Sequence, residues 1–142
     1  MGSRSVGSLA LADTSGLLAM AHPRDQYHIR AVAAARDFVR GGGRFVSTPL
    51  VLAELQGLLL YRSGPDVARR VTAALLEDAA FEWVEVNADV MAAAHSGWLE
   101  RFRDQTFTLC HAVSFEVMRR GRIKKALAFD QHFVTAGFAV LD

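Results

Sequence analysis

Short apolar runs alternate with longer amphipathic segments along this chain. Consecutive apolar residues predict buried strands, and strict alternation at one segment predicts a strand with one wet face. We therefore expect strands at residues 8–13, 44–47, 81–86, 126–129 and 138–141. Helical spacing of apolar residues predicts helices between them, at residues 28–40, 49–63, 66–77, 87–103 and 108–120. Thr14 to Gly16 is turn-prone and precedes a further apolar segment, residues 17–21.

Strands that alternate with helices indicate a mostly parallel sheet with helices on both faces. Ligands of such sheets bind outside the carboxyl ends of the strands. Asp13 is the last residue of one predicted strand and Asp130 directly follows another, so both should lie at that edge. We expect residues 1–8, which are small and polar, to be a flexible leader and residues 9–142 to form a single domain.

Composition adds limits without naming a function. A net charge of +1 gives no global field for a polyanion, so nucleic-acid binding would depend on a local patch. The single cysteine, Cys110, excludes an intramolecular disulfide and fits a reducing compartment, which indicates the cytoplasm. No apolar run approaches the roughly 20 residues that span a bilayer.

Glu54 is the most informative single residue, because it interrupts a strongly apolar helix that we expect to be largely buried. A buried carboxylate needs an ion pair, hydrogen bonds or a cation. A salt bridge to an arginine, or a side chain that just reaches solvent, would satisfy Glu54 alone, but Asp13 and Asp130 add two acids that a shared cation would neutralise. An oxygen-only set fits Mg²⁺ or Mn²⁺. Such a metal can activate water against a phosphodiester.

Three segments carry a resemblance to a known family. They are ADTSGLLAM around Asp13, TPLVLAEL around Glu54, and DQTFTLCHAVSFEVMRRGRIKKALAFDQHFVTAGF from Asp104 to Phe138. The chain resembles the PIN-domain ribonucleases, in particular VapC-type toxins of toxin–antitoxin pairs, over nearly its whole length. The resemblance implies an α/β three-layer sandwich and a Mg²⁺- or Mn²⁺-dependent endoribonuclease that cleaves RNA. It also implies inhibition by a cognate antitoxin, a homodimer, and Asp13, Glu54 and Asp130 as metal ligands.

His111 departs from the family pattern, which usually has an acid there. A neutral imidazole ligand would favour Mn²⁺ or Zn²⁺, an imidazolium could meet a phosphate, and a lost acid would leave a weak nuclease. These three interpretations stay open. Ser114 shares a helix face with His111 and could hydrogen-bond a ligand carboxylate or a metal-bound water. The rival function is accordingly a PIN-fold module that binds antitoxin or RNA without efficient cleavage.

Other polar residues are secondary candidates. Asp104 could replace the missing acid, although a turn or capping role competes with that interpretation. Basic residues precede the strand before Asp130 and either form a solvated helix end or contact the RNA backbone. These candidate RNA-binding residues are Arg119, Arg120, Lys124 and Lys125.

Overall fold

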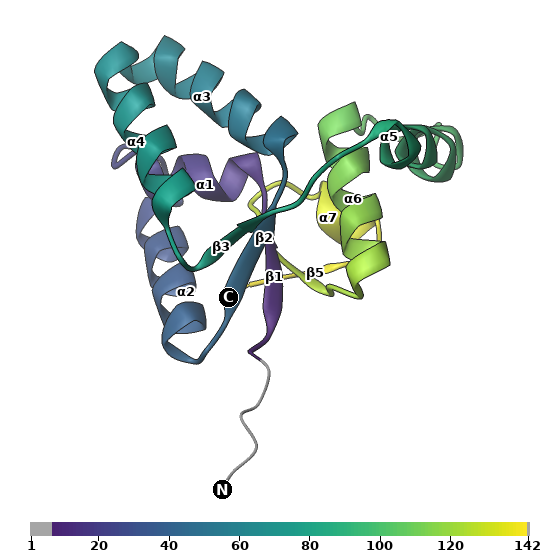
Figure 1. Cartoon of the computed structure of the whole chain (residues 1–142), viewed down its shortest axis with the longest axis horizontal. Coiled ribbons are helices and arrows are strands. Elements are labelled where there is room, and N and C mark those ends of the chain that lie inside the picture. The colour runs from purple at the N-terminus through teal and green to yellow at the C-terminus, as the bar shows by residue number, and fades with distance from the viewer. Residues whose placement is uncertain (1–6, 142) are drawn as a thin grey trace, which may run out of the picture.

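The computed structural model describes residues 7–141, so most of the expected leader (1–6) and residue 142 lie outside the described residues. Five strands form one sheet in which every neighbouring pair is parallel. Its order is β3-β2-β1-β4-β5 (Figure 1). The strands are β1 Leu9–Ala12, β2 Arg44–Ser47, β3 Phe81–Trp83, β4 Lys125–Leu127 and β5 Ala139–Val140.

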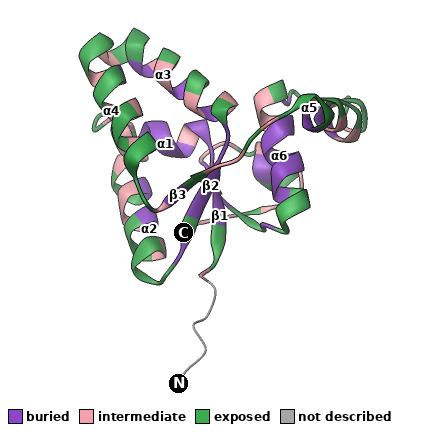
Figure 2. Ribbon diagram, viewed as in Figure 1, coloured by how far each residue is buried: buried purple, intermediate pink, exposed green. Residues whose placement is uncertain are grey.

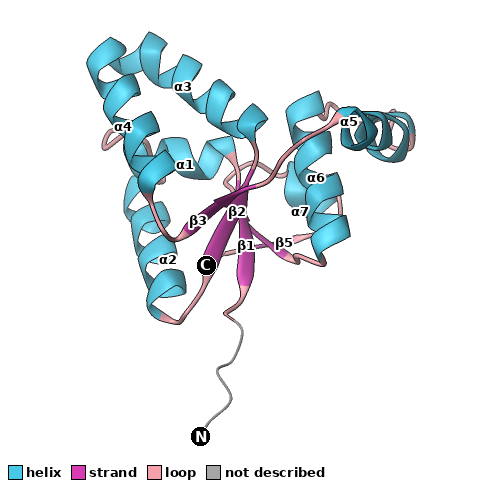
Figure 3. Cartoon of the chain, viewed as in Figure 1, coloured by secondary structure: helices cyan, strands magenta, loops and turns pink. Residues whose placement is uncertain are grey.

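Helices cover both faces of the sheet, which makes three layers (Figure 3). One layer contains α1 Thr14–Ala21, α2 His28–Arg40, α3 Pro49–Ser63 and α4 Pro65–Glu77. The other contains α5 Ala88–Ala94, the π-helical segment η1 His95–Glu100, α6 Leu109–Gly121 and α7 His132–Thr135. Within residues 7–141 no helix combines the length and the apolar character needed to cross a bilayer.

Successive residues of β1 point into different cores, as the pleat of a strand requires. Ala10 and Ala12 pack with α1 to α4, whereas Leu11 packs with α5, η1 and α6. All three are fully buried (Figure 2). The central strands are therefore apolar on both sides, which explains the consecutive apolar runs of the sequence.

The predicted fold class, an α/β three-layer sandwich with a mostly parallel sheet, is confirmed. Several local predictions are wrong. Residues 14–16 begin α1 instead of forming a turn, because the Asp13 side chain accepts a hydrogen bond from the Ser15 N–H and caps the helix at once. The strand expected up to residue 129 ends at Leu127, and the four-residue α7 was not predicted.

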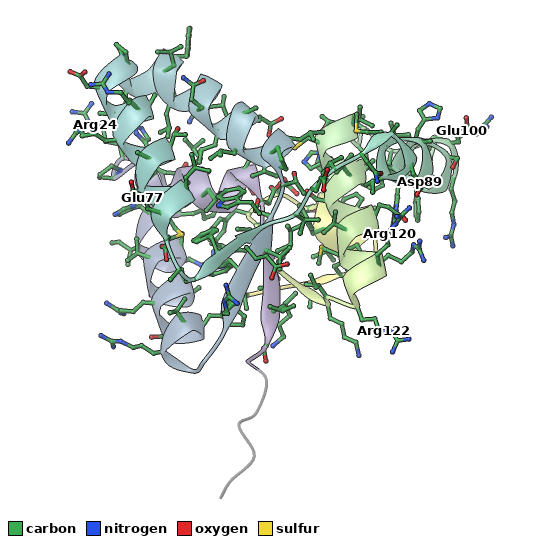
Figure 4. All side chains as sticks on the ribbon, viewed as in Figure 1. Arg24, Glu77, Asp89, Glu100, Arg120 and Arg122 are labelled. Atoms are coloured by element: carbon green, nitrogen blue, oxygen red, sulfur yellow. The ribbon has the colours of Figure 1, made fainter. Side chains whose placement is uncertain are left out.

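A buried carboxylate joins η1 to α6. Glu116, only 2% exposed, accepts hydrogen bonds from Arg119, Arg120 and the indole N–H of Trp98. Hydrogen bonds from the arginines, Arg119 first, lower its pKa to about 2 although burial opposes this. Arg120 also pairs with Asp89 at 3.1 Å, and Figure 4 shows both side chains on the α5–α6 side of the molecule.

Two substitutions of Glu116 should destabilise the fold by different amounts. Glu116→Gln keeps an acceptor for Trp98 and loses the charge, so we expect the free energy of unfolding to fall by about 1–2 kcal/mol. Glu116→Leu also leaves the indole N–H unpaired, and we expect a fall of about 2–4 kcal/mol. Urea unfolding at pH 7 measures both. The exposed Glu77 on α4 supplies the control Glu77→Gln, and equal losses in the two Glu116 variants would contradict this account.

Candidate metal centre

Two aspartates meet at the carboxyl edge of the sheet because β1 and β4 are neighbours. Asp13 directly follows β1, and Asp130 lies in the loop after β4. Ser15 connects the two chain segments. Its hydroxyl donates to Asp13 Oδ2 at 2.8 Å and accepts the Phe129 N–H at 3.0 Å. The backbone that carries Asp130 is thereby fixed against Asp13.

Asp13 is almost completely buried, with 1% of the residue exposed. Its Oδ2 is bonded to Ser15, but its Oδ1 has no hydrogen-bond partner among the described residues. Burial, reinforced by the charge of Asp130, raises the pKa of Asp13 to about 6. An unsatisfied buried carboxylate oxygen is costly and marks a position where a cation would be stabilising.

His111 reaches this pair from the first turn of α6. One ligand atom from each of Asp13, His111 and Asp130 lies within 4.8 Å of the others. The ring is held by a capping box, in which the Thr108 N–H donates to His111 Nδ1 at 3.1 Å. Nδ1 therefore acts as the acceptor, and the proton sits on Nε2, which faces Asp130 Oδ2 at 3.4 Å.

The charges of this group shift their pKa values in opposite directions. Burial alone would raise the pKa of Asp130, but the hydrogen bond and the charge of His111 hold it below the ordinary value. Burial likewise opposes protonation of His111, yet Asp130, Asp13 and Glu54 together raise the pKa of its ring. The Asp130 carboxylate thus favours its charged form, while Asp13 favours its neutral form until a cation binds.

Glu54 lies farther out than the sequence indicated. The expectation of a largely buried helix is wrong, because α3 buries only Val51, Leu55 and Leu59 along one stripe and Glu54 is exposed. Its carboxylate does not belong to the three-residue group, but its charge raises the pKa of both His111 and Cys110. Glu54 therefore faces the group at longer range.

The remaining candidates divide by position. Ser114 Oγ is fully buried without a hydrogen-bond partner among residues 7–141, so it makes no back-bond to its own helix. Asp104 is exposed in the turn before α6, whose cap is Thr108. Ser15 was not predicted, although a serine two residues after Asp13 was a signal for side-chain hydrogen bonding.

The basic run lies at the other edge of the sheet. Lys124 and Lys125 stand where β4 begins, whereas Asp130 follows its end. Arg120 is nine residues from His111 on α6, roughly 13 Å along the helix axis, and both it and Arg119 are paired with Glu116. Contact between these residues and RNA stays a prediction.

Taken together, the group fits a hard divalent cation. Two carboxylates converge, one oxygen is buried and unpartnered, and no thiolate takes part, since Cys110 has its pKa raised to about 12 by burial. His111 fits less well as a ligand, because its Nε2 proton faces Asp130 and its Nδ1 is engaged by Thr108.

Comparison with known proteins identifies a solved structure that is similar over nearly the whole chain. No family model matches the chain, and no curated protein matches it. The crystal structure of Mycobacterium tuberculosis VapC20, a sarcin-ricin loop cleaving toxin, is similar, with a TM-score of 0.81 and 30% sequence identity. The match covers 93% of this chain and 97% of that one.

Proposed function

Because this chain belongs to the VapC-type PIN-domain family of toxin ribonucleases, we propose that it is a Mg²⁺- or Mn²⁺-dependent endoribonuclease. One observation carries the proposal, namely that the buried Oδ1 of Asp13, beside Asp130 and His111, has no hydrogen-bond partner within residues 7–141. Asp13 and Asp130 would hold the metal, with Glu54 completing the acidic set from α3. When bound, a divalent metal supplies an activated water and stabilises charge on the scissile phosphate.

The protein's own residues prepare this site. Ser15 fixes Asp13 and the Phe129 backbone in one arrangement. His111 donates its Nε2 proton toward Asp130 and holds that carboxylate in its charged form. We assign His111 this donor role in preference to ligation, because its Nδ1 is occupied by the Thr108 N–H. Ser114 offers a free hydroxyl one turn away for a ligand carboxylate or a water.

The partners follow from the family. VapC20 cleaves the sarcin-ricin loop, and we propose an RNA of that kind as the first substrate to examine here. We further propose that the chain acts in the cytoplasm, pairs with a cognate antitoxin and forms a homodimer.

Metal-dependent cleavage tests the proposal. A labelled sarcin-ricin loop hairpin should be cut with Mg²⁺ or Mn²⁺ and stay intact with EDTA. Glu54→Gln removes the outer acid, and we expect the cleavage rate to fall about tenfold to a hundredfold. Glu77→Gln, at another exposed position on α4, should match the unaltered chain. Cleavage that persists in EDTA, or equal effects of the two substitutions, would contradict the assigned roles.

A further inference from the structure

An aromatic stack stands directly beside the acidic group and plays no part in the chemistry described above. Tyr27 and Phe129 stack with ring centroids 4.7 Å apart and planes 5° from parallel. Phe129 is the residue before Asp130, and its N–H is bonded to Ser15. The stack is therefore fixed to the backbone that carries the site.

Arg30 lies beside this stack and does not cover the outer face of either ring. Its guanidinium carbon is 5.8 Å from the Tyr27 centroid and 5.6 Å from that of Phe129. A cation nearly equidistant from two stacked rings lies along their edges, because one above an outer face would be much farther from the second ring. Arg30 is exposed and forms no ion pair among residues 7–141.

A small cavity opens next to Phe129. Its volume is about 230 Å³, below the roughly 300–1,000 Å³ of pockets for drug-sized ligands. A space of this size suits one planar ring system. Its lining combines the cation, the aromatic ring, apolar walls and one carboxylate: Arg30, Ala33, Ala34, Asp37, Phe129 and Leu141.

We propose that this cavity is a nucleobase subsite for single-stranded RNA, in which one base stacks on Phe129 while Arg30 contacts the adjacent phosphate. The inference rests on the proposed function, since it places the base next to the strand that the acidic group would cut. Stacking on an aromatic ring together with a nearby cation is how proteins bind unpaired nucleotides. Asp37, on the cavity wall, accepts hydrogen bonds and favours bases with an exocyclic amino group.

Binding without cleavage tests the subsite. Fluorescence anisotropy with labelled 12-mers of oligo(A), oligo(U) and an abasic strand, in EDTA, requires neither metal nor activity. We expect Arg30→Gln to weaken oligo(A) binding about tenfold. Arg40→Gln, the same charge change at an exposed position of the same helix outside the cavity, should change it less than about twofold. Oligo(A) should bind about fivefold tighter than oligo(U).

A cavity-filling variant separates base binding from simple charge. Ala33→Leu occupies the cavity without removing a polar group, so it should weaken oligo(A) about tenfold and leave the abasic strand unaffected. The subsite is overturned if Ala33→Leu has no effect, if Arg40→Gln weakens binding as much as Arg30→Gln, or if the variants impair antitoxin binding only. If the expected pattern appears in a chain that cuts no RNA, the subsite stands and the nuclease proposal fails. If the chain cleaves RNA but the variants do not show this binding pattern, the nuclease proposal stands and the subsite fails.

Discussion

Asp13→Asn is expected to abolish RNA cleavage and, without metal, to make the protein more stable. The amide retains an oxygen for the Ser15 N–H, so the cap of α1 survives. It removes a carboxylate that the fold buries and whose pKa is raised to about 6 by burial and by Asp130. We expect the cleavage rate to fall on the order of 10³-fold.

The sign of the stability change follows from the raised pKa. A carboxyl group with a folded pKa near 6 and an ordinary value of 3.8 favours folding while it is protonated. That contribution is complete below pH 4 and is lost as the pH rises through 6. The loss amounts to at most about 3 kcal/mol at neutral pH, and Asp13→Asn avoids it.

Urea unfolding between pH 4 and 8 in EDTA measures this difference. The pKa of His111 is also raised, but His111 is present in both chains, so the gap between their curves reports chiefly on Asp13. Added Mg²⁺ should stabilise the unaltered chain and leave Asp13→Asn unchanged. If Asp13→Asn is less stable than the unaltered chain at pH 7, contacts within the fold already offset the cost of burying the Asp13 charge.

Elements with strong local signals were predictable from the sequence. The boundaries of α2 and β2 agree with prediction because Gly41 to Gly43 stop the helix, and Thr48 with Pro49 marks the start of α3. The predictions fail where tertiary packing determines which residues are buried. Glu54 was expected inside because its neighbours are apolar, yet α3 packs through only one stripe and leaves several leucines partly exposed.

The sequence predicted a set of acids at one edge of the sheet, but it did not predict the contacts that position them. Ser15 binds a backbone N–H 114 residues away, a contact that no local pattern encodes. The orientation of the His111 ring was partly predictable from the sequence. Thr108 and His111 have the spacing of a capping box, so the engagement of Nδ1 follows from local helix chemistry. What the sequence could not indicate was that Nε2 then meets Asp130.

His111→Asp is expected to strengthen Mg²⁺ binding about tenfold and to raise cleavage at limiting Mg²⁺ by a similar factor. The change replaces a donor with a third carboxylate beside Asp13 and Asp130, and each added negative charge attracts the cation. An acidic residue also suits the first turn of α6. His111→Asn, neutral and of similar size to aspartate, is the matched control and should give no gain.

The three outcomes of this experiment separate the functions open to the chain. Faster cleavage by His111→Asp over a measurable native rate means that the histidine weakens metal binding in an active nuclease. Cleavage by the Asp variant alone means that the native chain is a PIN-fold module that binds antitoxin or RNA, since Asp13, Asp130 and Glu54 then do not suffice. No gain at any Mg²⁺ concentration would show that the 3.4 Å contact of His111 Nε2 with Asp130 serves the site as well as a fourth acid, and the charge argument would be wrong.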